Sequence, residues 1–265
     1  MGSGATSERG PNTDSGLGYA TGSGANPDMG FGHGPDTGSA PGLGTGPRVL
    51  DVGCGTGIAA RQLRDAGCTV LGVEPDERMA EFARGTGVIV ETAAFESWDP
   101  AGRTVDAVVA AQSWHWVDPA VGPAQVARVL RSGGLFVALW HVFTPPDPVA
   151  QAFADAYRRV VPDAPFQLST TAEQALQSYA AGCTRTADAF LATGEFSGAE
   201  QWRADWEHSY TTGSYLDLML TTGSLTPLAR DKVDVVVDAV SNAIDAMGGG
   251  FTASYSTLAV AVVRA

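Results

Sequence analysis

The sequence predicts an α/β fold with a mostly parallel sheet and crossover helices. Short apolar runs alternate with segments of helical periodicity from residue 47 to about residue 145. A glycine-rich turn joins the first apolar run to the first helical segment. Strands that alternate with helices in this way are typical of parallel sheets, because a parallel strand pair needs a crossover connection.

Each element is predicted from its own pattern. Strands are expected where apolar and β-branched residues run together, at residues 48–53, 69–74, 87–92, 105–112 and 135–140. Helices are expected between them at about 56–66, 76–84 and 119–131, the last followed by the turn RSGG at 131–134. Beyond about residue 148 the pattern is mainly helical, over about 150–160, 171–181 and 226–247, before a long final strand at 251–265.

The domain organisation follows from a change in composition near residue 47. Residues 1–46 hold 14 of the 33 glycines and show almost no apolar periodicity, so a flexible N-terminal segment is expected there. Residues 47–265 are expected to form one domain, because 44% hydrophobic content over this length can bury a sizeable core.

Charge and cysteine content restrict the classes of partner. A net charge of −13 gives no basic face for phosphates, so neither nucleic acid nor an anionic membrane is expected as a partner, and a small molecule is. Three cysteines without paired spacing predict neither a disulfide framework nor a metal site. The N-terminus lacks a signal-peptide pattern and no apolar run reaches the ~20 residues of a membrane helix, so a cytoplasmic location is expected.

The glycine-rich turn RVLDVGCGTGIAARQL, residues 48–63, predicts a nucleoside-like ligand. Glycines let the backbone approach a ligand, and the following helix adds free N–H donors. Gly53, Gly55 and Gly57 form G-x-G-x-G, while Gly55, Gly57 and Ala60 also satisfy the dinucleotide pattern G-x-G-x-x-A. Glu74 ends the next strand and could accept hydrogen bonds from ribose hydroxyls in either case, so the turn alone leaves both ligands open.

Five ordered motifs narrow the choice. LDVGCGTG, VEPDERM, AAFESWD, AAQSWHWVDP and VARVLRSGGLFVALW together resemble the class I S-adenosylmethionine-dependent methyltransferases, and more narrowly a small-molecule branch with Trp-His-Trp after the fourth strand. The likeness covers roughly residues 47–145 closely. It implies a Rossmann-like, doubly wound, seven-stranded sheet with an antiparallel last strand and helices on both faces. It also implies S-adenosyl-L-methionine as cofactor, a small organic acceptor, and a variable substrate-covering segment at about 145–225.

The resemblance also implies cofactor-binding roles for individual residues. Gly53, Gly55 and Gly57 would let the backbone approach the methionine part, Asp51 would hold the loop and receive the ammonium, and Glu74 would bind the ribose. The remaining cofactor residues it implies lie near the adenine or the sulfonium: Pro75, Met79, Ala94, Phe95, Glu96 and Gln112.

Four aromatic residues are candidates for the acceptor side. Trp114 and Trp116 are expected as pocket walls, since aromatic faces suit a sulfonium, although both could equally be core. His115 is the candidate general base, and His141 is a weaker candidate in the substrate pocket.

Two alternatives remain at this point. One is an NAD(P)-dependent oxidoreductase that uses the same loop, and the other is a non-catalytic cofactor-binding relic of the family. The second gains some support because relatives begin with a helical lid carrying Tyr and Arg-Pro, whereas this chain has only a glycine-rich stretch around Tyr19. The sequence does not predict whether O, N or C is methylated.

Overall fold

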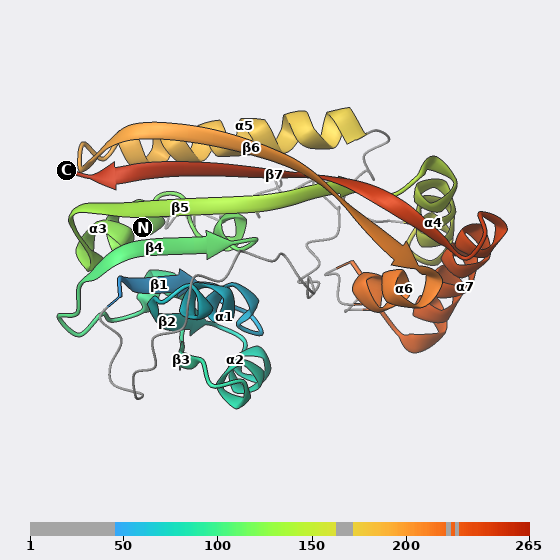
Figure 1. Cartoon of the computed structure of the whole chain (residues 1–265), viewed down its shortest axis with the longest axis horizontal. Coiled ribbons are helices and arrows are strands. Elements are labelled where there is room, and N and C mark those ends of the chain that lie inside the picture. Colours follow the sequence, from blue (N-terminus) through green and yellow to red (C-terminus); the bar gives the residue numbers. More distant parts are fainter. Residues whose placement is uncertain (1–45, 163–171, 221–223, 226–227) are drawn as a thin grey trace, which may run out of the picture.

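A seven-stranded sheet forms the centre of the molecule (Figure 1). The computed structural model describes residues 46–162, 172–220, 224–225 and 228–265, so the predicted N-terminal segment, apart from Gly46, lies outside the described residues. The strand order is β3-β2-β1-β4-β5-β7-β6. The strands are β1 (Arg48–Val52), β2 (Thr69–Glu74), β3 (Ile89–Thr92), β4 (Val105–Ala111), β5 (Leu130–Thr144), β6 (Phe196–Thr211) and β7 (Gly250–Arg264).

Neighbouring strands are parallel from β3 to β5, and β7 runs antiparallel to both β5 and β6. The predicted seven-stranded, mostly parallel sheet with an antiparallel last strand is therefore confirmed. The helices are α1 (Ile58–Asp65), α2 (Glu77–Gly85), α3 (Gly122–Val129), α4 (Asp147–Val160), α5 (Ala172–Leu191), α6 (Thr212–Leu220) and α7 (Arg230–Ala246), with short 3-10 helices η1 (Phe95–Ser97) and η2 (Trp114–Trp116).

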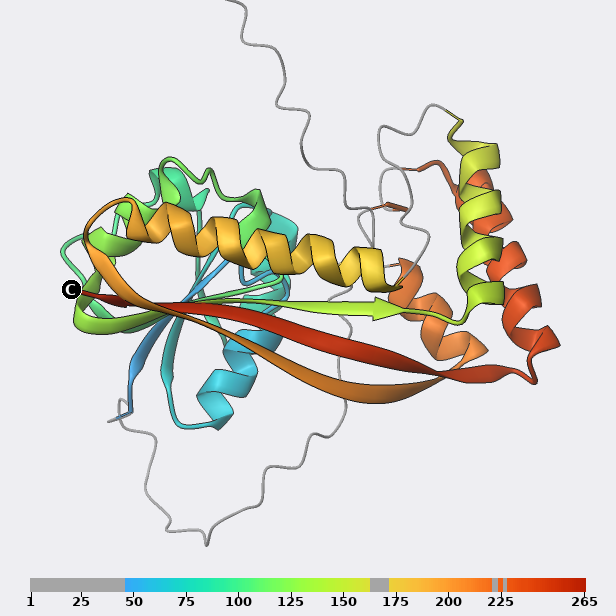
Figure 2. The ribbon, with the colours of Figure 1, turned by 90° about the horizontal axis from the view of Figure 1, so that it is seen from above.

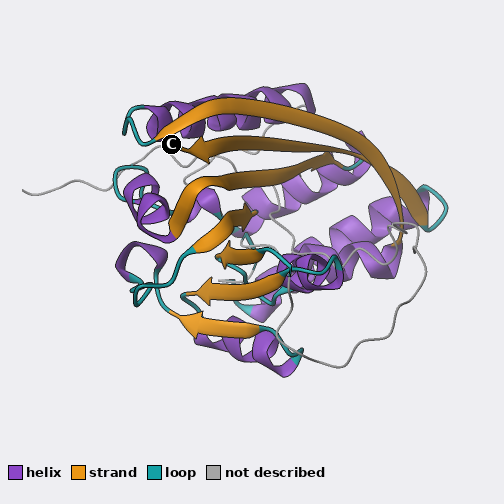
Figure 3. Ribbon diagram, turned by 60° about the vertical axis from the view of Figure 1, so that its left-hand side comes forward, coloured by secondary structure: helices purple, strands orange, loops and turns teal. Residues whose placement is uncertain are grey.

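Helices cover the two faces of the sheet unequally, as Figure 3 shows. We call the side of α1 and α2 the front face, where small side chains such as Cys54, Ala60 and Ala83 pack together. The rear face is the side of α3 and α5, where Phe136, Phe190 and many other apolar residues form the largest core cluster. Alternate residues of each strand therefore belong to different layers.

The three longest strands carry a second, helical end of the molecule. β5, β6 and β7 run beyond the short strands to α4, α6 and α7 (Figures 1 and 2). There Phe143 of β5 and Tyr255 of β7 join buried residues of the three helices in a separate aromatic-rich cluster. The predicted substrate-covering segment at 145–225 is thus divided, because α5 and β6 belong to the sheet layers and only α4 and α6 belong to the helical end.

The expectation of mainly helical structure after residue 148 missed β6. Residues 197–205 of this strand are all exposed, but from Trp202 to Tyr210 apolar and aromatic residues alternate with charged or polar ones, and this alternation could have revealed the strand. In the sheet, 14 residues of β6 pair with residues of β7. β6 is an edge strand, since it pairs with β7 alone and ends the strand order.

The predicted turn RSGG lies within β5 instead of before it. The β4–β5 register jumps from Val105↔Leu130 to Ala107↔Leu135, so the extra residues form an irregularity in the pairing. Gly133 takes a φ of +71°, which suits glycine. β5 also continues past the predicted end at residue 140, to Thr144, because β7 pairs with it over that whole length.

No helix in the described ranges is long and apolar enough to cross a membrane.

Candidate active site

The glycine-rich loop lies between β1 and α1 at the carboxyl edge of the sheet, where open α/β sheets bind ligands. Gly53, Gly55 and Gly57 all have left-handed φ, between +54° and +79°. A Cβ on Gly53 would come within 2.5 Å of the Cβ of Ser113, and one on Gly57 within 3.1 Å of Ala83. Gly53 and Gly57 are therefore required by close packing within the protein.

Gly55 differs from the other two glycines. A Cβ there would meet no atom closer than the sulfur of Met79, at 4.0 Å. The protein itself leaves this side of Gly55 open, which is what a loop that receives a ligand needs.

Glu74 holds the loop in place. Its carboxylate accepts hydrogen bonds from the backbone N–H of Gly55 at 2.8 Å and of Asp76 at 3.0 Å, and the residue is only 6% exposed. Each carboxylate oxygen keeps further lone-pair capacity. The residue predicted to bind ribose is thus rigidly oriented at the end of β2.

The expectation that Asp51 holds the loop stays a prediction, because the ordinary hydrogen bonds at the start of the loop come from another strand. The backbone N–H groups of Gly53 and Cys54 donate instead to the carbonyl of Val73, at 2.8 and 3.2 Å. Neither carboxylate oxygen of Asp51 has a hydrogen-bond partner of ordinary geometry among the described residues, although the side chain is completely buried.

Burial raises the pKa of Asp51 to about 7, opposed by the nearby N–H of Ala60 and aided by the negative charge of Glu74. A buried, unpaired carboxylate is costly unless a cation or donor accompanies it. The site is therefore electrostatically prepared for a positive group.

Gln112, at the end of β4, is a second unsatisfied polar residue at this edge. Its φ is +61°, unusual for a residue other than glycine, and its Oε1 is buried without a partner in the described part of the chain. Its Nε2 donates to the carbonyl of His141 at 3.3 Å. Strained backbone together with an orphaned acceptor is typical of binding sites.

The predicted adenine edge is formed by exposed residues after β2 and β3. Met79 is 45% exposed, so it is not a core residue, and Pro75 and Ala94 are also exposed. Asp76 caps α2 by accepting from the N–H of Arg78 and Met79. Phe95, expected near the adenine or the sulfonium, is buried and packs against Trp98 and Trp114.

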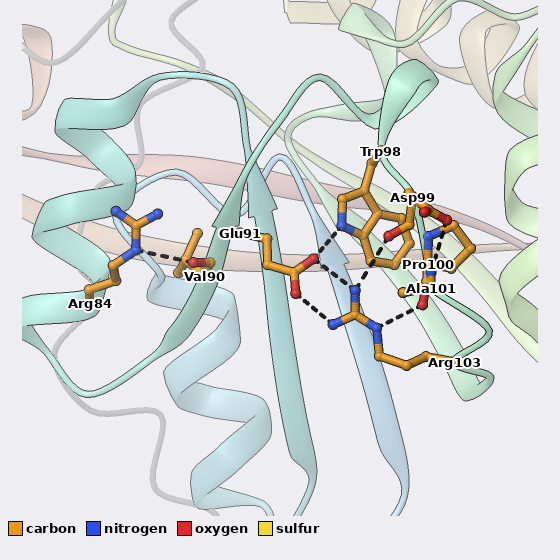
Figure 4. Close-up of polar contacts among 8 residues, drawn as sticks. All are labelled: Arg84, Val90, Glu91, Trp98, Asp99, Pro100, Ala101 and Arg103. Carbon is orange, nitrogen blue, oxygen red and sulfur yellow. Dashed lines mark hydrogen bonds and ion pairs between the residues drawn. The ribbon is translucent and has the colours of Figure 1, made fainter.

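The loop after β3 is held by polar contacts that sequence reasoning missed (Figure 4). Arg103 makes two hydrogen bonds to the Glu91 carboxylate at 2.6 and 2.9 Å, and the indole N–H of Trp98 donates to the same group at 2.6 Å. The guanidinium of Arg103 lowers the pKa of Glu91. From α3, the buried Gln125 donates to the carbonyls of Phe95 and Trp98.

These contacts fix Ala94 and Glu96 at the carboxyl edge. Glu96 itself accepts from the N–H of Asp118 at 2.9 Å, so its carboxylate joins two loops. The pairs are separated by 7 to 30 positions in the sequence, and nothing in the local pattern signals them.

The Trp-His-Trp segment, η2, belongs mainly to the rear face. Trp114 is 5% exposed and packs on Phe136 and Phe190, so of the two places that the sequence left open, pocket wall and core, it takes the core. Trp116 is 75% exposed. The two tryptophans therefore do not form a common wall.

His115 is tied to the rear core by Trp140, whose indole N–H donates to its Nδ1 at 3.2 Å. In neutral imidazole the nitrogen that accepts carries no proton, so the lone pair that a general base needs is already engaged. Loss of hydration next to the protein lowers the pKa of His115. This geometry argues against the predicted role of His115 as general base.

We expect His115→Ala to act on stability and not on proton transfer. Removing the imidazole leaves the buried indole N–H of Trp140 without its acceptor, at a cost of about 1–3 kcal/mol in unfolding free energy. Trp140→Phe in the same chain should recover part of that loss in a double-mutant cycle followed by urea unfolding. A general base would instead show itself as a lost inflection in the pH–rate profile with normal stability.

A shallow hollow elsewhere is not part of this site. It has a volume of about 340 Å³ and is lined by Arg64, Cys68 and Ile89 among others. These residues lie at the amino ends of β2 and β3, opposite the edge where Glu74 ends its strand.

Comparison with known proteins agrees with this geometry. A family model described as a methyltransferase domain matches residues 50–138. An uncharacterized methyltransferase of Mycobacterium tuberculosis is 42% identical over 98 residues, which cover 36% of this chain and 40% of the relative. A ubiquinone biosynthesis O-methyltransferase of Rhizobium etli is 35% identical over 101 residues, 35% of this chain and 41% of that protein. The chain thus spans about 40% of the length of these curated relatives.

Solved structures show the same fold. A protein of Anaeromyxobacter dehalogenans assigned as a type II methyltransferase superposes with a TM-score of 0.55 at 20% identity, over 84% of this chain and 92% of its own. A protein of Anabaena variabilis assigned as a methyltransferase from an antibiotic biosynthesis pathway gives 0.53 at 15% identity, over 81% and 90%.

The sheet order and the glycine loop define a Rossmann-like α/β domain. The match of residues 50–138 to a methyltransferase-domain model agrees with the class I S-adenosylmethionine-dependent methyltransferase domain that the sequence motifs predicted. The narrower Trp-His-Trp branch stays a prediction.

Proposed function

We propose that this protein transfers a methyl group from S-adenosylmethionine to a small organic acceptor. The observation that carries the proposal is Asp51, a fully buried carboxyl without a partner among the described residues, beside a loop that is open at Gly55. S-adenosylmethionine brings an ammonium group that an unpaired carboxylate can accept as a charge-assisted hydrogen-bond donor.

The same observation weighs against a dinucleotide. A bound dinucleotide would place its pyrophosphate at the N-terminus of the first helix. Asp51 faces the first turn of α1, close enough to the N–H of Ala60 for that group to oppose the rise in its pKa. A phosphate placed there would meet a buried acid with Glu74 nearby, so the charges favour a cationic ligand.

The chain's own residues would hold the cofactor in three places. Asp51 would bind the ammonium, Glu74 would accept from the ribose hydroxyls, and Met79 would offer an apolar contact to the adenine. When bound, the cofactor supplies a sulfonium-activated methyl group, so the protein needs mainly to position the acceptor and exclude water.

The acceptor would lie on a part of the sheet that helices leave open. Val137, Leu139 and His141 of β5 and Ala259 of β7 point to the front face and are partly exposed. Their neighbours in sequence, such as Ala138 and Trp140, are buried under α5 on the rear face. We call these four residues, together with Trp202 and Thr257, the open front face. It lies between the cofactor loop and the helical end.

The proposal is tested by a search for the acceptor. Small phenols, carboxylic acids and amines are incubated with S-adenosylmethionine, and the products are screened by mass spectrometry for a gain of one methyl group. A product formed by the wild type and not by a Glu74→Ala variant supports the enzyme. Tight cofactor binding without any product across the panel would favour the non-catalytic relic.

Glu74→Ala is expected to weaken binding of both S-adenosylmethionine and S-adenosylhomocysteine by roughly 10- to 100-fold, or about 1–3 kcal/mol. Part of this loss comes from the loop, because the variant also frees the N–H groups of Gly55 and Asp76. Titration calorimetry measures the change. Glu77→Ala is the matched control, since this exposed acid three residues further on pairs with Arg84. Unchanged affinity in Glu74→Ala would remove this residue from the site.

A further inference from the structure

A chain of polar contacts crosses three strands on the open front face. His141 of β5 lies directly opposite Thr257 of β7 in the sheet register. The Nδ1 of His141 is 2.8 Å from the hydroxyl oxygen of Thr257, and the indole N–H of Trp206 on β6 donates to the same oxygen at 2.9 Å. Trp206 also packs edge-on against the imidazole, with ring centres 5.6 Å apart.

These polar contacts orient the imidazole of His141 differently from the imidazole of His115. Trp206 can only donate, so it uses one lone pair of the Thr257 oxygen; the second lone pair can accept a hydrogen bond from Nδ1–H of His141, and the direction of this bond depends on the tautomer. With the proton on Nδ1, the lone pair of the imidazole is on Nε2, which has no hydrogen-bond partner among the described residues. His115 has no comparable freedom, because Trp140 occupies its Nδ1.

The position of His141 links it to the predicted methyl donor site. Its backbone carbonyl accepts from Gln112, the strained residue at the end of β4. Leu139, two residues earlier, lies on the same face and pairs with Ala111, next to Gln112. His141 therefore lies just beyond the carboxyl end of β4, on the face that also carries Asp51.

The electrostatic surroundings of His141 are simple. Thr257 and Trp206 face it from β7 and β6, and neither titrates at ordinary pH; Gln112 faces it from β4. Tyr255, the next residue on the same face of β7, has its pKa raised by burial and stays neutral. Burial lowers the pKa of His141, and no charged group contributes to that shift. Burial therefore favours the neutral form of the imidazole.

We propose that His141 accepts a proton at Nε2 from an acceptor hydroxyl, and that Thr257 and Trp206 are positioning residues that hold it in this tautomer; this inference rests on the proposed methyl transfer. In the step, the hydroxyl proton moves to Nε2 while the hydroxyl oxygen bonds the methyl carbon. The electron pair of the broken S–CH₃ bond stays on sulfur, which becomes neutral. Leu139, Ala259 and the half-exposed Trp202 on the same face suit an apolar or aromatic alcohol or phenol.

The first test needs no acceptor and compares two ligands that differ in one charge. The dissociation constants of S-adenosylmethionine and S-adenosylhomocysteine are measured by calorimetry from pH 5 to pH 8. Protonated His141 repels the sulfonium of S-adenosylmethionine but not the neutral sulfur of S-adenosylhomocysteine. The dissociation constant of S-adenosylmethionine divided by that of S-adenosylhomocysteine should therefore rise at least about threefold as the pH falls. Effects of Asp51 cancel in the ratio, because both ligands carry the same ammonium.

His141→Asn should make this ratio independent of pH, and His115→Asn should leave its pH dependence as in the wild type. A pH dependence that persists in His141→Asn contradicts the inference while the proposed function stands. Failure of both ligands to bind the folded wild type overturns the proposed function and the inference with it.

The second test reads the tautomer directly. Nitrogen-15 NMR of histidine-labelled protein, with the His141 signals identified by their loss in His141→Asn, should show the proton on Nδ1 in the wild type and in Thr257→Ser. Thr257→Val should lose this preference, whereas Thr252→Val, on the opposite face of β7, should keep it. A wild type with the proton on Nε2 would overturn the assignment.

Discussion

An Asp51→Asn variant is expected to be more stable than the wild type at pH 8 and to lose cofactor binding. Burial raises the pKa of Asp51 to about 7, so folding at pH 8 requires an unpaired buried carboxylate. Asparagine removes that charge but leaves a buried amide, so we expect a gain of about 1–3 kcal/mol in unfolding free energy, below the full value of the pKa shift. Binding of S-adenosylhomocysteine should weaken about 10- to 100-fold through loss of the charge-assisted contact.

The pH dependence of this effect has a defined sign. A carboxyl group whose pKa is raised on folding contributes stability that is complete below the unfolded pKa and is lost as the pH rises through the folded value. The stability difference between Asp51→Asn and wild type should therefore grow between about pH 4 and pH 7 and stay level above pH 7. Urea unfolding at a series of pH values measures it.

Asp106→Asn is the matched control. Asp106 pairs with Arg48 and Arg131, which hold its pKa below the usual range, so the same substitution there should lower stability at neutral pH. If Asp51→Asn lowers stability at neutral pH as Asp106→Asn does, the Asp51 carboxylate has a partner in solution. Asp51 would then not be available to bind a cationic group.

Replacement of Gly55 by alanine or valine is expected to abolish cofactor binding with the fold retained. The added Cβ meets no protein atom closer than 4.0 Å, so it would enter only the space that the loop leaves for a ligand. The φ of +54° adds backbone strain of about 1–2 kcal/mol for a residue other than glycine. Circular dichroism and thermal melting report the fold, and calorimetry reports the binding.

Gly67→Ala and Gly67→Val separate strain from ligand exclusion. Gly67 follows α1, has a φ of +94°, and has open space around its missing Cβ. These controls should lose comparable stability and bind cofactor normally. Normal binding by Gly55→Val would mean that the loop is only a tight turn, and the assignment of the site would fail.

The local patterns of the sequence predicted the part of the fold that carries the cofactor loop. β1, the three left-handed glycines and α1 form a continuous signal, because strand, turn and helix each constrain neighbouring residues. Glu74 was placed correctly at the end of β2 for the same reason. β6 was missed although apolar and aromatic residues alternate with polar ones from Trp202 to Tyr210, which is a strand pattern that local reasoning could have used.

The errors in the candidate site have a different origin. His115 and Trp140 are 25 positions apart, and His141 and Thr257 are 116 apart, so the contact that occupies one imidazole and the contact that orients the other are tertiary. Sequence spacing placed both histidines near the carboxyl edge. It could not show that η2 packs toward the rear face while His141 points to the front.

The most direct measurement of the central claim is calorimetric titration of the wild type with S-adenosylhomocysteine and with NAD⁺ and NADH, in two buffers of different ionisation enthalpy at pH 6.5. We expect S-adenosylhomocysteine to bind with release of protons, because its ammonium lowers the raised pKa of Asp51, and we expect neither dinucleotide to bind. Binding of NAD⁺ or NADH without binding of S-adenosylhomocysteine would contradict the central claim.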